Sequence, residues 1–433
     1  MKIDTLKLTN FRAFDEFELK FDPRLTVVIA HNGAGKSSIL DAIATNLGPF
    51  LTRLPSVSGQ NPKDTDFKVF ANGKKPPYMR IHCITTVGVE WDRTVRRDQT
   101  LKTSSAIPSG VGIKQLFNYV DKFIDAHNEN QEYSLPVFIH YGTGRGVFDV
   151  PQRKRGFSKM FPRFDAFNGA LESRTNFKKF VEYFYYLEEK ESRLQKEQRS
   201  FDIEIPELKA IRKAINTLMP EFSNPRTGAP AGILVDWKHD GEVKKLKIEQ
   251  LSDGYRTTLA MVMDIASRMA EANPYMDDPL QTEGVILIDE VDLHLHPEWQ
   301  RNFLPKLIDT FPQVQFIVTT HSPFIIQSVK TGKLVDLDRV DPDDSPSLNK
   351  ELSVEDITQE IMGVKGIQRS AIYNRRMKLA YKYYQLLDND LNPDTPEVKE
   401  IGAELDEIEE LFSDNPAETA LLKSERRKSE ANQ

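Results

Sequence analysis

The chain opens with short segments in which apolar and polar residues alternate. Residues 2–9 and 15–21 alternate with a period of two, which predicts half-buried strands paired as a hairpin around Asn10-Phe11-Arg12. Residues 25–30 and 284–289 are nearly continuous apolar runs, typical of strands buried on both faces. The same patterns predict further strands within 79–97, 136–141, 315–320 and 334–340.

Helical spacing of apolar residues appears between these strands. Helices are predicted at 38–47, 114–127, 166–200 and 206–219, after 251–256, and over much of the chain from 351. Three segments rich in turn residues are predicted loops: 50–77, 98–112 and 223–232. Buried strands that alternate with helices indicate an α/β fold.

A glycine-bearing segment joins the strand at 25–30 to the helix that follows it. It reads Ala30-His31-Asn32-Gly33-Ala34-Gly35-Lys36-Ser37, followed by Ser38. A strand, a glycine-rich turn and a helix start, in that order, predict a phosphate-binding loop in which Lys36 reaches the β/γ-phosphates and Ser37 ligates Mg²⁺. Ala30 replaces the first glycine of the motif, which requires a negative φ there. A chance Gly-Lys-Ser is the alternative.

The strand at 284–289 ends in two carboxylates, Asp289 and Glu290. A carboxylate at the carboxyl end of a strand is placed to hold Mg²⁺, mainly through water, and this is the role predicted for Asp289. The next residue, Glu290, is placed to polarise the attacking water as the general base. Acid pairs after strands also occur by chance. This pair becomes a strong signal because the predicted phosphate-binding loop precedes it in the same chain.

Two further segments suit contact with an anion. Ser252 and Gly254, at the start of a predicted helix, offer a hydroxyl and a backbone amide, although a plain helix cap has the same sequence. His321 directly follows the buried strand at 315–320, where ligands bind at the carboxyl edge of an open sheet. A solvated loop histidine is the alternative for His321.

Together these residues resemble ABC/SMC-like ATPase heads, over residues 1–50 and 245–340. Three segments resemble RecF-like and OLD-like proteins in particular: Asn10 to Phe14, Asp289 to Pro297 and Thr320 to Pro323. The resemblance implies an α/β head with a mixed-sheet core that binds ATP and Mg²⁺. It also implies that two heads pair head to tail, with Ser252 and Gly254 completing the partner's site and Asp292 near the dimer interface.

This fold class has N-terminal antiparallel strands, and the chain adds a helical insertion and a helical C-terminal extension. The expected domain organisation has four parts: the head's N-terminal part at 1–144, a largely helical insertion at 145–244, the head's C-terminal part at 245–345, and a helical, acidic, partner-binding region at 346–433. Gln99, Gln131 and Gln152 lie where such heads carry a glutamine loop, but none has the expected strand before it. His294 and His296 have His-x-His metal spacing, and the structural interpretation is favoured because the family motif accounts for them.

Ile139 to Arg145, the basic and aromatic stretch after it, and the tail near Ser413-Asp414-Asn415-Pro416 resemble the ATPase subunit of Septu-type anti-phage systems, including retron-associated versions. This resemblance implies a partner HNH nuclease, DNA reached through the complex, an oligomer built from dimers and, in a retron, a reverse transcriptase with its RNA and DNA. One alternative is a RecF-like repair or chromosome-maintenance ATPase that binds DNA directly. Another is a self-contained OLD-like nuclease with Asp336 and Asp338 as its metal pair, for which the solvated face of a final strand is the simpler interpretation.

Composition narrows these expectations. The 433 residues carry a net charge of −7 and one cysteine, Cys83, which excludes an internal disulfide framework and a cysteine-rich metal site. The sequence has no long apolar window and no signal-peptide pattern at Met1-Lys2-Ile3-Asp4, so a cytoplasmic protein without membrane spans is expected. The charge is uneven. Residues 145–179 hold nine basic and three acidic residues, and 397–433 hold eleven acidic and five basic ones.

Both charged regions have two interpretations. The basic stretch, with six interleaved Phe residues, either contacts nucleic acid through phosphates and stacked bases or packs as an insertion with a solvated basic face. In the acidic tail, apolar residues recur at three- and four-residue steps and predict an amphipathic helix: Val398, Ile401, Leu405, Ile408 and Phe412. That helix either packs on its own chain or binds a partner.

Overall fold

The computed structural model describes residues 1–146, 161–173, 178–228, 232–339, 352–363, 371–388 and 395–410. The chain forms two compact units, Met1–Ile357 and Thr358–Gln433. Gln152, Phe412 and the acidic tail beyond 410 lie outside the described residues. No helix in the described part of the chain is both long and apolar enough to span a bilayer.

A four-stranded antiparallel sheet holds the start of the chain. Its order is β2-β1-β4-β5. Its strands are β1 Ile3–Phe11, β2 Phe14–Lys20, β4 Tyr78–Thr85 and β5 Glu90–Arg96. The predicted hairpin is confirmed: β1 and β2 are antiparallel, and the closing pair Phe11 and Phe14 leaves Arg12 and Ala13 as the turn.

A parallel five-stranded sheet forms the centre of the first unit, in the order β12-β3-β11-β10-β6. Its strands are β3 Leu25–Ile29, β6 Val137–Tyr141, β10 Gly284–Ile288, β11 Val314–Thr319 and β12 Lys333–Asp336. Every residue of β3, β6, β10 and β11 is buried, as their apolar runs predict. Because all five strands are parallel, the segments that follow them converge on one edge of the sheet.

Helix α1 (Lys36–Arg53) lies between the two sheets and contacts β4 on one side and β6, β10 and β11 on the other. Its predicted apolar face is fully buried, at Ile39, Leu40, Ile43 and Leu47. The other helices of the first unit are α2 Leu101–Ser105, α3 Lys114–Asn128, α4 Lys178–Gln198, α5 Pro206–Leu218, α6 Asp253–Ala272, α7 Pro297–Thr310, α8 Pro323–Ser328 and α9 Val354–Asp356. The short α2 lies in a segment predicted to be a loop.

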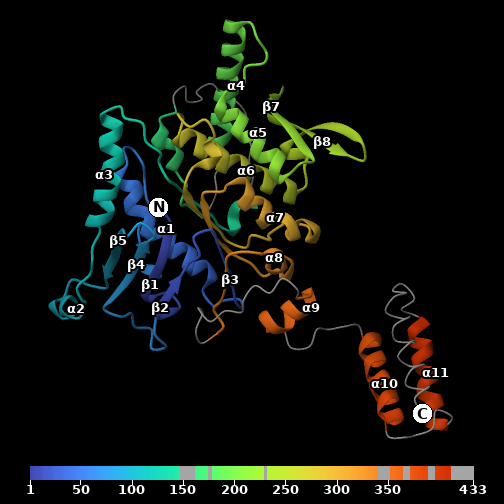
Figure 1. Ribbon diagram of the computed structural model, residues 1–433. Helices are drawn as coiled ribbons and strands as arrows, with labels where there is room; N and C mark the ends of the chain where they lie inside the picture. The colour runs from blue at the N-terminus through green and yellow to red at the C-terminus, as the bar shows by residue number, and fades with distance from the viewer. Residues whose placement is uncertain are drawn as a thin grey trace. The chain divides into compact units, whose positions relative to one another are not determined.

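The described part of the insertion contains strands as well as helices. Helices α4 and α5 are followed by a three-stranded antiparallel sheet, β7 Phe222–Gly228, β8 Gly232–His239 and β9 Glu242–Lys247. The prediction of a loop at 223–232 was therefore wrong at 223–228 and at Gly232, and 229–231 lie outside the described residues. Pro225 lies in the edge strand β7, where the register shifts between Ser223 and Arg226, and an edge irregularity tolerates a proline that lacks an N–H. Figure 1 shows α4, α5, β7 and β8 together at one end of the first unit.

The described residues of the basic stretch are packed. Arg145 and Arg163 are 2% and 8% exposed, and Phe164 and Phe167 are buried. Arg163 donates to the carbonyl oxygen of Ala272 at 2.8 Å. For these residues the packed interpretation is confirmed. Five basic residues of the stretch lie outside the described residues: Arg153, Lys154, Arg155, Lys159 and Arg174.

The second unit contains two helices, α10 (Ala371–Asp388) and α11 (Pro396–Glu410). The predicted amphipathic helix is confirmed as α11. Its apolar residues Val398 and Ile401 are buried in one cluster with Tyr383 of α10. This face therefore packs on the neighbouring helix.

The side chain of Gln315 joins the two sheets, which suggests a stability test. Its amide donates to the carbonyl oxygens of Ile3 at 2.7 Å and Asp22 at 2.9 Å, and its oxygen accepts from the Ile3 N–H at 2.8 Å. We predict that Gln315→Leu lowers the free energy of unfolding by about 3 kcal/mol, because three main-chain groups, two of them in buried hydrogen bonds, lose their partner. Urea unfolding measures this. The control Gln327→Leu removes one half-buried bond and should cost about 1 kcal/mol. Equal losses in the two variants would contradict the prediction.

Candidate nucleotide-hydrolysis site

The predicted phosphate-binding loop curls between β3 and α1. Gly33 and Gly35 have φ of 88° and 105°, in the left-handed region that glycine tolerates best. A Cβ at Gly35 would also lie 2.7 Å from the Phe14 ring. Ala30 is not among the residues with positive φ, so alanine fits in place of the first glycine. Asn32 and Gly33 are exposed, and Ala34 and Ser38 are half-buried, so backbone amides remain accessible at this loop.

The ammonium group of Lys36 folds back into the loop. It donates to the carbonyl oxygens of Ala30 at 2.9 Å and His31 at 3.0 Å. Burial lowers the pKa of Lys36, while the nearby carboxylates of Asp289, Asp338 and Glu290 act in the opposite direction. The lysine thus lies beside the carboxylates that follow β10 and β12.

Asp289 links the phosphate-binding loop to the central strands. One carboxylate oxygen accepts from the Ser37 hydroxyl at 2.7 Å, and the other accepts from the Thr319 hydroxyl at 2.6 Å. The Thr319 oxygen in turn accepts from the Glu290 N–H at 2.7 Å. Residues from α1, β11 and the end of β10 therefore form one continuous hydrogen-bonded array.

Glu290 is held in an unusual backbone conformation. Its φ is 46°, a left-handed value that carries strain for a residue other than glycine. It is half-buried, whereas its neighbour Asp289 is only 6% exposed. His321, half-buried, follows β11 at the same edge of the sheet, and beside it the Thr320 hydroxyl donates to Asp292 at 2.5 Å.

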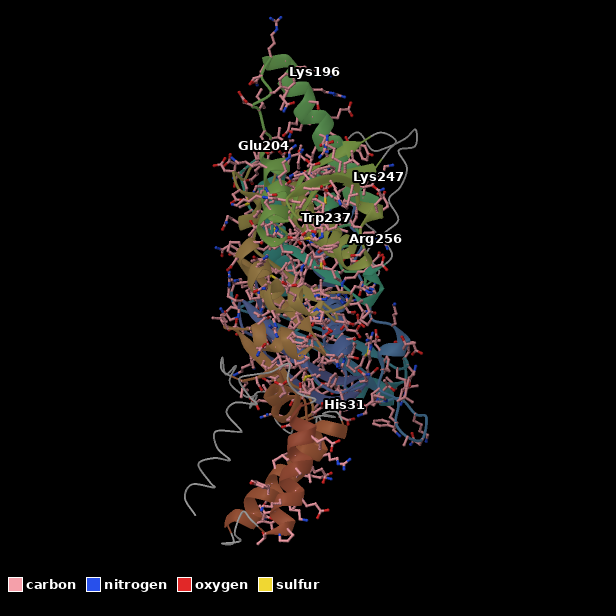
Figure 2. All side chains as sticks on the ribbon, turned by 90° about the vertical axis from the view of Figure 1, so that its right-hand side faces the viewer. His31, Lys196, Glu204, Trp237, Lys247 and Arg256 are labelled. Carbon is pink, nitrogen blue, oxygen red and sulfur yellow. The ribbon has the colours of Figure 1, made fainter. Side chains whose placement is uncertain are left out.

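The segment with Ser252 and Gly254 lies elsewhere on the first unit. Ser252 is the exposed N-cap residue of α6, and its side chain makes no capping bond. A Cβ at Gly254 would lie 2.3 Å from the carbonyl oxygen of His294, so only glycine fits there. Figure 2 shows Arg256, in the first turn of α6, well separated from His31 in the phosphate-binding loop. The chain does not bring Ser252 and Gly254 to its own loop.

His294 and His296 lie at positions that suit a structural role. His294 has a φ of 64°, and His296 caps α7 by accepting from the Glu298 N–H at 3.4 Å. Within the described ranges, no group of three or more His, Cys, Asp or Glu side chains is arranged to hold a metal. These observations favour the structural interpretation of both residues.

Sequence reasoning missed two residues at this site. Asp338 accepts from the His31 N–H at 2.7 Å and pairs with the His31 ring, so it contacts the phosphate-binding loop. Asp336 accepts from the Asp338 N–H at 3.1 Å and pairs with Arg339 at 3.3 Å. The Asp-x-Asp pair considered for a nuclease is therefore engaged beside the ATPase loop. A carboxylate just beyond the edge strand was the only sequence signal for this role.

The second missed residue is Arg145, which follows β6. This strand pairs with β10, and the chain after it reads Gly142-Thr143-Gly144-Arg145 with no glutamine. Arg145 donates to the carbonyl oxygens of Asp289 and Glu290, both at 2.5 Å. Its place directly after a buried strand was the available signal, but its partners are main-chain atoms that no motif records.

The fold and this array define an ATPase of the ABC/SMC-like class. A family model described as an AAA domain matches residues 5–223, half of the chain, and the chain belongs to that family. It is 28% identical over 394 residues to the "Retron Ec83 probable ATPase" of Escherichia coli, covering 77% of this chain and 71% of that protein. It is 35% identical over 148 residues to the "Septu protein PtuA" of Bacillus mycoides (strain KBAB4), covering 34% of this chain and 18% of that protein. The solved SMC head domain from Thermotoga maritima is similar with a TM-score of 0.38 and 15% identity, over 78% of this chain and 94% of that one.

The array makes Glu290 the residue to test for the chemical step. We predict that Glu290→Gln lowers the rate of ATP hydrolysis by about 10²- to 10⁴-fold, because an amide cannot accept a proton from water. Nucleotide binding should remain, since the phosphate-binding loop is intact. Turnover assays and equilibrium binding of a labelled nucleotide measure the two effects. Glu298→Gln, an exposed change on α7, is the matched control. Normal turnover in Glu290→Gln would show that another group is the base.

Proposed function

We propose that this chain is the ATP-dependent sensor and regulatory subunit of a Septu-like anti-phage system, and that its nucleotide state controls a partner HNH nuclease. The observation that carries the ATPase half of the proposal is the array of Ser37, Asp289, Thr319 and Glu290. The defence half is supported by similarity to a retron ATPase over 77% of the chain and by the shorter match to a Septu protein.

The residues of the array fit Mg²⁺ and ATP. The Ser37 hydroxyl and the Asp289 carboxylate, 2.7 Å apart, are hard oxygen donors of the kind that Mg²⁺ prefers, and they would hold the ion. The bound ion would offset negative charge on the phosphate oxygens. Gly33, Ala34 and Gly35 offer amides to the phosphates, as do Asn32 and Ser38 at either end of the loop.

Hydrolysis then needs a base, a cation and a contact on the terminal phosphate. Glu290 takes a proton from the attacking water, and Lys36 leaves the carbonyls of its own loop for the β/γ-phosphates. His321 contacts the γ-phosphate from the end of β11. These roles need no large rearrangement of the parallel sheet, because all three residues already follow its strands or the loop at one edge.

We also propose that two heads pair head to tail, as a dimer or within a higher oligomer. The exposed Ser252, whose side chain makes no capping bond, and the separation of the nearby Arg256 from His31 in Figure 2 support a role in the partner's site. DNA would be reached through the nuclease, and in a retron-type system a reverse transcriptase with its RNA and DNA would join the complex. The engagement of Asp338 with His31 makes a self-contained nuclease less favoured.

Mixing two inactive variants tests the shared site. Lys36→Ala removes the cation for the phosphates, and Ser252→Arg blocks the surface meant for the partner. We predict that each alone is inactive and that an equal mixture regains about a quarter of wild-type turnover, since half of randomly paired dimers would hold one intact site of two. Steady-state ATPase assays measure this, and Lys102→Ala, on an exposed lysine, is the control. A mixture that stays inactive would contradict a head-to-tail site.

Reconstitution with the partner tests the regulatory half. We predict that cutting of DNA by the complex falls as ATP is titrated in, and that Glu290→Gln prolongs the suppression because bound ATP persists. The nuclease alone is the control. Cutting that is indifferent to ATP would overturn nucleotide control. The RecF-like alternative predicts instead that the isolated chain binds DNA in a salt-sensitive manner, and that neutralising Arg153, Lys154 and Arg155 weakens this binding.

A further inference from the structure

Arg145 is a buried arginine at the turn that carries the catalytic carboxylates. It lies in the short helical segment Thr143–Gly146 directly after β6, and it is 2% exposed. One guanidinium nitrogen donates to the carbonyl oxygens of Gly142 at 3.1 Å and Asp289 at 2.5 Å. The other donates to the carbonyl oxygen of Glu290 at 2.5 Å. The side chain therefore spans two consecutive peptide groups of the Asp289-Glu290 turn.

Placing a guanidinium here is costly, so its surroundings must offset the cost. Burial lowers the pKa of Arg145, whereas the carboxylates of Asp289, Asp292 and Glu290 act to raise it. A buried charge whose hydrogen bonds are all made is tolerated, but an uncompensated one strongly destabilises a protein. Arg145 thus offsets the negative charge of three neighbouring carboxylates while it binds main-chain oxygens.

The backbone that Arg145 binds is strained. Glu290 has a φ of 46°, and such a conformation persists only where its surroundings hold it. The Thr319 hydroxyl accepts from the Glu290 N–H on one side, and Arg145 donates to the Glu290 carbonyl on the other. Both peptide groups that flank this residue are consequently fixed, and the direction of its side chain depends on them.

We propose that Arg145 is a positioning residue for ATP hydrolysis, which holds the Asp289-Glu290 turn so that the Glu290 carboxylate faces the attacking water. The inference rests on the proposed role of Glu290 as the base. Arg145 acts through this residue and through the main chain, without touching the nucleotide. It is also the first residue of the insertion, so the insertion begins in contact with the catalytic turn.

The test compares Arg145→Gln and Arg145→Lys with a matched control. Misplacing a catalytic group by a small distance lowers turnover strongly, so Arg145→Gln should reduce kcat about 10- to 100-fold. KM and nucleotide affinity should stay within about threefold, because the phosphate-binding loop is untouched. Arg145→Lys keeps the charge and one donor nitrogen and should recover part of the loss. If the glutamine variant does not fold, the lysine variant still carries the kcat measurement.

Arg163→Gln is the control for a merely structural loss. Arg163 is also buried and donates to main-chain carbonyl oxygens, those of Ala272 and Tyr133, away from the catalytic turn. It should lower the melting temperature but leave kcat unchanged. An equal loss of kcat in Arg163→Gln and Arg145→Gln would overturn the positioning role.

A double-mutant cycle separates this inference from the proposed function. If Arg145 acts through Glu290, the double variant that carries both Arg145→Gln and Glu290→Gln should hydrolyse ATP no more slowly than Glu290→Gln alone. Losses that multiply would overturn the inference. Normal kcat in Arg145→Gln beside a slow Glu290→Gln would overturn the role of Arg145 alone. Normal turnover in Glu290→Gln would overturn the base itself, and positioning through it as well.

Discussion

The hydrogen bond from Ser37 to Asp289 joins residues that are 252 positions apart in the chain, and the candidate site depends on it. It exists because β3 and β10 are parallel strands separated only by β11, so their carboxyl ends lie at one edge. Thr319, at the end of the intervening β11, occupies the space between them and binds both Asp289 and the Glu290 N–H. A parallel sheet thus converts three distant segments into one array without help from any flexible loop.

The elements that the sequence predicted correctly are those whose cause is local. A nearly continuous apolar run specifies β3 wherever it lies, and the glycine-rich turn before Lys36 specifies the left-handed backbone conformation at Gly33 and Gly35. The β7–β9 sheet was missed because its signals conflict: Pro225 indicates a loop, and β9 is largely exposed. Arg145 and Asp338 were missed for a different reason. Their partners include a main-chain carbonyl and a main-chain N–H in the segments that follow other strands, and such groups leave no trace in residue identity.

The count of basic residues along the insertion also gave a misleading expectation about their contacts. Counted along the chain, Arg145 and Arg163 belong to a basic stretch that suits nucleic acid. In the structure both are buried and donate to main-chain carbonyl oxygens. A count of basic residues does not distinguish a guanidinium that meets solvent from one that holds a turn. The residues at 153–155 lie outside the described residues, and the salt dependence of DNA binding tests whether they contact nucleic acid.

The two proposed halves of the nucleotide site also differ in how they are stabilised. The half with Lys36 and Asp289 is bound within the chain by hydrogen bonds between α1, β10 and β11. The half with Ser252 and Gly254 packs on the chain through backbone contact with His294, yet it leaves the Ser252 hydroxyl exposed and unused. His294 lies only a few residues after Glu290, so the two halves are connected through one short segment. We propose this short segment as the path by which a change at the Asp289-Glu290 turn reaches the surface proposed to meet a second head.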